Sequence, residues 1–183
     1  KRWGGHLRAD SPFLGYFYYV EAFGGSVRDA NDFMTSQFGD DAALQALEWI
    51  RQGMWDVNCF IQSNQLSATG LPNTWTGVLP ANIVAFAERS ADQFFSLAES
   101  LPEGSWNISH VPKGPKGQAS MGAPDIWCIY KGVNDRGNQD AVWQFLKWMS
   151  VSDYYQDNVA TKAGRIAGLL SAANKWPDTL RKL

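Results

Sequence analysis

Residues 106–149 read WNISHVPKGPKGQASMGAPDIWCIYKGVNDRGNQDAVWQFLKWM, and three kinds of element follow one another in this stretch. The segment 111–117 (VPKGPKG) holds two prolines and two glycines, which predicts a connecting turn because neither a helix nor a central strand can pass through it. The apolar run 126–130 (IWCIY) is short and lies between a proline and a glycine. It predicts a strand that is buried on both faces.

The sequence changes to a helical period at Asn138. Asn138 can cap a helix, Asp140 falls in its first turn, and apolar side chains then recur at spacings of three and four up to Met149. A strand, a short loop and a helix make half of a parallel crossover unit, so this stretch favours an α/β fold.

Elsewhere the pattern predicts a mostly helical chain. The expected elements, in order, are a helix over 13–23 ended by Gly24 and Gly25, a helix over 41–52 capped by Asp40 and stopped by Gly53, a loop over 62–80, a helix over 81–89, a strand over 94–97, a strand over 106–111, and a helix over 153–162 ended by Gly164. A single helix through 81–97 is an alternative. For the second helix the expected core face consists of Ala43, Leu44, Leu47 and Ile50.

Composition limits the classes of function. The chain has 183 residues with 45% hydrophobic and 19% charged side chains, which suits one or at most two folded domains. A formal net charge of −2 offers no electrostatic footprint for nucleic acid or for an anionic membrane, and no run is apolar enough to span a bilayer. Cys59 and Cys128 could pair in an oxidising compartment or could both be small apolar residues.

Catalytic and cofactor chemistry find little support. The two histidines, His6 and His110, have no cysteine or histidine at ligand spacing, so no metal site is expected. There is no nucleophile elbow, phosphate loop or dinucleotide fingerprint, and no cofactor is predicted. Carboxylate pairs such as Asp40 with Asp41 or Glu99 with Glu103 remain open as glycosidase acids, although no local environment singles them out.

Two ordered blocks resemble the family 1 extracellular solute-binding proteins, the ligand receptors of ABC importers. The first block is PKGPKG at 112–117, an apolar strand that ends in Lys-Gly at 126–132, and AVWQFLKWM at 141–149. The second is FGGS followed by an aspartate at 23–29, then AALQALEW at 42–49. Both match the family pattern in order and spacing, over most of residues 7–170.

The resemblance implies an α/β fold of the type II periplasmic-binding-protein kind, rich in helix. Members are about twice this length, so the chain is expected to lack their N-terminal half. Residues 1–112 would form the main part of the second lobe, 113–164 a hinge-proximal turn and a strand-helix segment related to the first lobe, and 165–183 the return toward the second lobe. Such a fragment is expected to bind ligand weakly by itself.

The function that the resemblance implies is binding and not catalysis. The expected ligand is a sugar or oligosaccharide held between two lobes, and the expected partner is an ABC permease in the membrane, with no nucleic acid involved. The full-length protein is expected to be monomeric and periplasmic or extracellular, with a membrane anchor through an N-terminal lipid that precedes this sequence. The alternative is a carbohydrate-active enzyme domain or a carbohydrate-binding module.

Candidate ligand residues come from both arguments. The resemblance points to aromatics of the helix before the Gly-Gly pair, to the loop that enters the strand near the hinge, and to an arginine where the chain returns: Phe13, Tyr16, Phe17, Asp125, Trp127 and Arg165. Trp75 is added because it lies in polar loop sequence with no evident core to enter. Each has an ordinary structural alternative, namely core packing for the aromatics, an Asx turn for Asp125 and a solvated side chain for Arg165.

Overall fold

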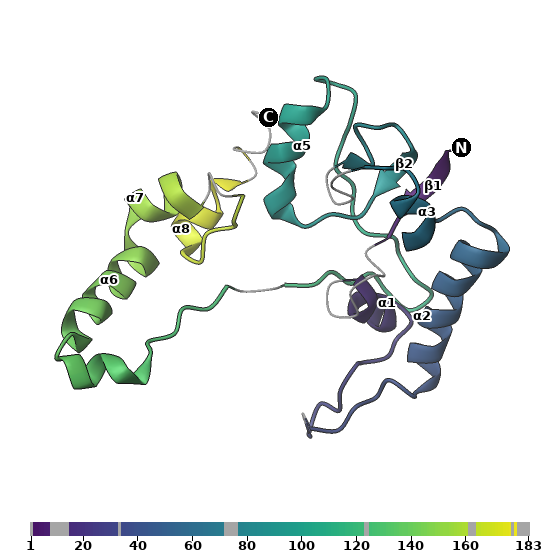
Figure 1. The fold of residues 1–183 in the computed structure, drawn as a ribbon. Helices are drawn as coiled ribbons and strands as arrows, with labels where there is room; N and C mark the ends of the chain where they lie inside the picture. Colours follow the sequence, from purple (N-terminus) through teal and green to yellow (C-terminus); the bar gives the residue numbers. More distant parts are fainter. Residues whose placement is uncertain are drawn as a thin grey trace. The chain divides into compact units, whose positions relative to one another are not determined.

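The computed structural model describes residues 2–7, 15–32, 34–71, 77–122, 125–160, 164–176 and 178 (Figure 1). The chain divides into two compact units. Unit 1 comprises Lys1–Arg89 and Ser100–Gly122, and unit 2 comprises Ser90–Glu99 and Ala123–Leu183. Helices and a small parallel sheet together fit an α/β class.

The sheet belongs to unit 1. Strand β1 (Trp3–His6) pairs in parallel with β2 (Val84–Ala87), and Gly5 lies opposite Phe86. Across its other edge, the Gly5 amide donates to the Cys59 carbonyl at 3.1 Å. A Cβ on Gly5 would stand 2.2 Å from the Phe86 ring, so only glycine fits here.

Among the described residues, the α-helices between the two strands are α1 (Phe17–Ala22), α2 (Asp41–Arg51) and α3 (Ser63–Ser67). The predicted C-terminal end of the first helix is confirmed, since the chain turns at Gly24 with a φ of 89°, while its predicted start at Phe13 lies outside the described residues. The predicted second helix is confirmed in place, but Gly53 does not stop it. The chain continues as a π-helical turn over Gln52–Asp56, and a Cβ on Gly53 would lie 2.3 Å from the Phe60 ring. That glycine serves close packing.

The core of unit 1 lies where α1, α2 and the sheet meet. Its main cluster consists of buried aliphatic and aromatic side chains: Leu7, Tyr18, Tyr19, Val20, Ala43, Ala46, Ile50, Met54 and Phe60. A second cluster consists of Ile61, Leu66, Val78 and Val84. Close packing of this kind fixes α2 against α1.

The segment 111–117 is a connector, as the sequence predicts. The Gly114 amide donates to the Gly117 carbonyl at 2.8 Å, and the Lys116 amide donates to the Ala22 carbonyl at 3.0 Å. A Cβ on Gly114 would stand 2.5 Å from that carbonyl oxygen. The turn therefore packs directly on the C-terminal end of α1.

Unit 2 is helical in the part that the structure describes. Its described elements are a 3₁₀ turn over Ala91–Gln93, α5 (Phe94–Ser100), a 3₁₀ turn over Lys131–Arg136, α6 (Gln139–Val151), α7 (Asp153–Tyr155) with a π-helical turn over Gln156–Ala160, and α8 (Leu170–Ala173). The expected helices after Asn138 and from Asp153 to residue 160 are confirmed. Few side chains are buried here: Leu97, Met149, Gln156, Ala167, Ala172 and Trp176.

Two neighbouring predictions are wrong because helix and strand are exchanged. Residues 84–87 form strand β2 instead of a helix, and residues 94–100 form helix α5 instead of a strand. The single helix through 81–97 is excluded by the same strand. Short apolar runs are ambiguous, and here pairing with β1 decides the conformation of the first run.

The predicted strands at 106–111 and 126–130 are also wrong. Neither segment joins a ladder among the described residues, and the side chains of 126–130 are exposed, Ile126 by 76%. A strand needs a hydrogen-bonding neighbour, and IWCIY has none in the part of the chain that the structure describes. The predicted loop at 62–80 is interrupted by α3.

Candidate functional site

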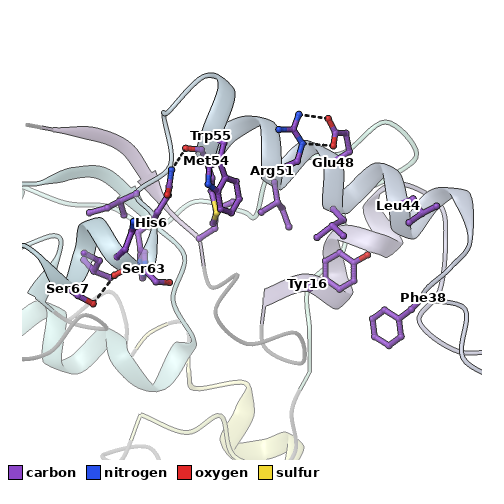
Figure 2. Close-up of a pocket in the computed structure, with 17 residues that line it drawn as sticks. His6, Tyr16, Phe38, Leu44, Glu48, Arg51, Met54, Trp55, Ser63 and Ser67 are labelled. Atoms are coloured by element: carbon purple, nitrogen blue, oxygen red, sulfur yellow. Dashed lines mark hydrogen bonds and ion pairs between the residues drawn. The ribbon is translucent and has the colours of Figure 1, made fainter.

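A groove of about 1470 Å³ runs along α2 in unit 1 (Figure 2). One set of lining side chains is apolar and aromatic: Leu7, Tyr16, Phe38, Leu44, Leu47, Ile50, Met54, Trp55, Ile61 and Leu66. The other set is polar or charged: His6, Glu48, Arg51, Gln62, Ser63, Asn64 and Ser67. The groove is thus amphipathic.

Helix α2 supplies the apolar wall. It buries Ala43 and Ala46 against the core, whereas Leu44 and Leu47 remain 52% exposed and face the groove. The sequence placed both leucines in the core, and this is corrected. The small alanines let α1 approach one side of the helix, and the leucines on the neighbouring stripe are left to line the groove.

Aromatic rings lie along this wall. The ring of Tyr16 stacks on Phe38 with centroids 5.8 Å apart and planes 9° from parallel. The Tyr16 hydroxyl donates to the Ala43 carbonyl at 2.6 Å, and burial raises the pKa of this phenol above its ordinary value. The hydroxyl therefore stays protonated and fixes the ring. Trp55, from the turn after α2, is 59% exposed.

The polar side chains gather around α3 (Figure 2). The Gln62 side-chain amide donates to the Met54 carbonyl at 2.8 Å, which ties α3 to the turn after α2. The Ser67 hydroxyl donates to the Ser63 carbonyl at 2.9 Å. The Asn64 side-chain oxygen accepts from the Gln65 amide at 2.8 Å, while the Asn64 side-chain nitrogen has no hydrogen-bond partner within the described residues. That nitrogen can donate to a ligand.

His6 closes the same end of the groove and is only 7% exposed. Its Nδ1 lies 3.0 Å from Nη1 of Arg89. Because a guanidinium only donates hydrogen bonds, Nδ1 accepts here, and the neutral imidazole then carries its proton on Nε2. Nη1 of Arg89 also donates to the main-chain carbonyl of Glu88, whose carboxylate accepts from the Tyr19 hydroxyl at 3.1 Å.

Charged side chains form the rim of the groove: Glu48 and Arg51 line it, and Asp56, which is not among the lining residues, pairs with Arg51. Nε and Nη2 of Arg51 donate to the two carboxylate oxygens of Glu48 at 2.7 and 2.8 Å. Nη2 and Nη1 donate to the two oxygens of Asp56 at 2.6 and 3.0 Å. Hydrogen bonds from Arg51, and then from Gln52, lower the pKa of Glu48 to about 2. We call Glu48, Arg51 and Asp56 the ion trio.

The predicted site residues of unit 1 are partly brought together. Tyr16 lines the groove. Phe17 is not among the lining residues, but its ring packs on Phe38 with centroids 5.5 Å apart. Phe13 and Trp75 lie outside the described residues.

The other three candidates belong to unit 2. Nε of Arg165 lies 3.3 Å from the Asp125 carboxylate, so the structure pairs two of the predicted residues. Nη1 of Arg165 lies 3.9 Å from Asp92. Trp127 is 62% exposed and presents its indole to solvent.

Sequence reasoning missed most of the groove. Phe38 and Trp55 lie in irregular or π-helical backbone, where no period marks them. A usable signal was present on α2, because AALQALEWI carries apolar residues at five of its first seven positions, which is wider than one packing neighbour can cover. The excess width indicates a second apolar surface.

Several further features complete the site description. Cys59 and Cys128 are both free thiols. Within the described ranges no helix is long and apolar enough to cross a bilayer, and no cluster of three or more histidine, cysteine or acidic side chains is arranged to hold a metal ion. No protein family, curated protein or solved structure matches the chain.

Proposed function

We propose that this chain is the solute-binding component of an ABC importer and that it captures a sugar or oligosaccharide in a cleft between two lobes of a type II binding-protein fold. The groove of unit 1 supplies one wall of that cleft. The two ordered sequence blocks at 23–49 and 112–149 support the family assignment. The groove supports the choice of ligand.

The observation that carries the proposal is the composition of the groove. Sugars present apolar C–H faces that stack on aromatic rings, and hydroxyl groups that need donors and acceptors. Tyr16, Phe38 and Trp55 offer rings, and the residues around α3 offer amides and hydroxyls. Ligand sites are typically apolar clefts with a few placed polar groups, and they occupy roughly 300–1,000 Å³. At about 1470 Å³ the groove has room for more than one sugar ring.

The groove favours capture over hydrolysis. Glycosidases need two carboxyl groups, one of which has a raised pKa so that it can donate a proton. Among the described lining residues only Glu48 has a carboxylate. Hydrogen bonding from Arg51 lowers the pKa of Glu48 to about 2, so this carboxyl group is ionised near neutral pH and cannot serve as a general acid. A pair of carboxyl groups on opposite sides of a scissile bond is not formed by these residues.

Binding is tested directly with the whole chain. Saturation-transfer NMR and calorimetry with a panel of neutral mono-, di- and trisaccharides should detect at least one ligand, with weak affinity. Trp55→Ala removes an exposed ring from the groove and should weaken that affinity by roughly fivefold, since the loss of a stacked aromatic is worth on the order of 1 kcal/mol. The matched control is Trp143→Ala, which removes an indole that is 55% exposed in unit 2.

Three results would count against the proposal. If no sugar in the panel binds, or if Trp143→Ala weakens binding as much as Trp55→Ala, the groove is not the site. If chromogenic glycosides are hydrolysed and Glu48→Gln abolishes the turnover, the chain is a carbohydrate-active enzyme.

A further inference from the structure

We propose that the ion trio makes the groove selective for uncharged sugars and against acidic sugars such as uronates and sulfated or phosphorylated saccharides. This inference rests on the proposed function and names the ligand class for the same groove. It concerns charge, which stacking rings cannot discriminate.

The first step is that the described lining residues offer no cation that is free to receive an anion. Arg51 is the only lysine or arginine among the described lining residues. Four of its five N–H donors are used by the two carboxylates of the trio. Both pairings are bidentate, which is the geometry in which a guanidinium holds a carboxylate most firmly. An incoming carboxylate or sulfate would have to displace Glu48 or Asp56.

The second step is the sign of the remaining charge. One guanidinium and two carboxylates leave a net charge of −1 at the rim. Glu48 stays ionised at any pH well above 2, because its pKa is lowered to about that value. The trio also stands at the C-terminal end of α2, where the helix dipole adds a partial negative charge. An anionic ligand meets repulsion from each of these sources.

The third step is that the polar groups opposite are neutral. Apart from Tyr16 and the indole N–H of Trp55, the other described lining side chains able to hydrogen-bond are His6, Gln62, Ser63, Asn64 and Ser67. His6 accepts a hydrogen bond from Arg89 at Nδ1 and is neutral in that arrangement. Amides, hydroxyls and a neutral imidazole suit sugar hydroxyls and give no compensation for a ligand carboxylate.

The magnitude is set by solvent screening. The side chains of Glu48 and Arg51 are 48% and 46% exposed, so the trio acts through partly hydrated space. One unit charge at a few ångströms under these conditions changes affinity by roughly tenfold at low ionic strength, and less when the Debye length shortens to about 4 Å or below in concentrated salt. Discrimination should therefore fall as salt is added.

The experiment compares a ligand with its own acid. The tightest neutral binder of the panel is oxidised at its primary hydroxyls to the uronate, and both forms are titrated into the whole chain by calorimetry at low salt. We expect the neutral form to bind roughly tenfold more tightly, and the ratio to approach one in about 1 M sodium chloride. A panel of uronate oligosaccharides is screened in parallel.

Charge variants of the trio should shift the ratio in opposite directions. Arg51→Gln leaves two carboxylates and should increase the preference for the neutral form. The double variant Glu48→Gln, Asp56→Asn frees a cation and should reverse it. Glu103→Gln, an exposed carboxylate of unit 1 outside the groove lining, is the matched control and should leave the ratio unchanged. Circular dichroism confirms that each variant is folded.

The outcomes separate the two proposals. If neutral sugars and their uronates bind equally well, or if the ratio of the two affinities does not change with salt concentration, the selectivity is overturned and the proposed function stands. If only acidic sugars bind, the selectivity is overturned in sign. If neither class of sugar binds, both the proposed function and this inference are overturned.

Discussion

Unit 1 and unit 2 each contain one long amphipathic helix, yet only unit 1 buries the apolar face of its helix well. Helix α2 packs Ala43, Ala46 and Ile50 into a cluster with α1 and the sheet. Helix α6 buries Met149 alone, while Trp143 and Phe145 on the same helix are more than half exposed. An apolar period specifies which side chains can be buried, and burial follows only where a second element supplies the opposite surface.

The largest expected difference between the units comes from removing one phenyl ring from each. Phe60 is 8% exposed and lies between the rings of Trp49 and Phe86. Phe60→Ala should lower the free energy of unfolding by about 3–5 kcal/mol, since it leaves a cavity in a packed core. Phe145→Ala should cost about 1 kcal/mol or less, because its ring only stacks on Trp148 at the surface.

Urea denaturation followed by circular dichroism measures both changes. Hydrogen exchange read separately for peptides of each unit shows which unit responds. Equal losses for the two variants would mean that α6 is buried as deeply as the core of unit 1, and would break the comparison.

The turn at 111–117 offers a finer test within unit 1. Gly114→Ala places a Cβ against the Ala22 carbonyl, at 2.5 Å before any relaxation, whereas Gly117 has nothing within 4 Å of the corresponding position. We expect a loss of about 2 kcal/mol for the first variant and a change within about 0.5 kcal/mol for the second. Thermal denaturation of the two variants side by side measures this. Similar melting temperatures would show that the turn does not pack on α1.

The local parts of this fold could be predicted from sequence. Helices at 41–51 and 139–151 are long and periodic enough to be recognised, and Gly24 and the PKGPKG turn mark real changes of direction. These features depend on residues close together in the chain. Capping residues, dipole preferences and glycine conformations act within one or two turns.

The parts that depended on distant partners could not be predicted. Val84–Ala87 is a strand because Trp3–His6 lies beside it, and the run at 126–130 is unpaired because nothing described lies beside it. The same limit applies to the site. Tyr16 was proposed from the sequence, whereas Phe38 reaches the groove through ring contacts with Tyr16 and Phe17, from a loop without a period.

Two glycines of unit 2 test whether the looser packing of this unit still fixes the conformation of its backbone. Gly164 has a φ of 77°, and a Cβ there would lie 2.6 Å from the Asp92 carbonyl oxygen, while Gly168 has nothing within 4 Å. Gly164→Ala should cost about 1 kcal/mol, through the left-handed backbone and the contact together. Gly168→Ala should be nearly silent. The measurement is hydrogen exchange of peptides from unit 2. If neither variant changes the exchange rates, this segment moves aside freely to accept the added methyl group.

The smallest expected effects are electrostatic. They concern how stability depends on pH: a contribution in unit 1 is lost at acid pH, and one in unit 2 is lost at alkaline pH. The pKa of Glu48 in unit 1 is lowered from 4.5 to about 2 by hydrogen bonds from Arg51 and Gln52. A depressed carboxyl pKa contributes stability that is present above the unfolded value and is lost as the pH falls from about 4.5 toward 2. Glu48→Gln should therefore flatten the decline of stability in that acid range.

The pKa of Lys175 in unit 2 is raised by its hydrogen bond to Asp157, at 2.7 Å. A raised lysine pKa contributes stability that is complete below its ordinary value of 10.5 and is lost as the pH rises through the higher folded value. Lys175→Met should thus flatten the alkaline limb, which Glu48→Gln should leave unchanged. Urea midpoints between pH 2.5 and 11 measure both limbs. Both pairings of the ion trio are exposed, and exposed ion pairs can be lost with little other change in the structure. If the acid limb is identical in the wild type and in Glu48→Gln, the ion trio is not formed in solution.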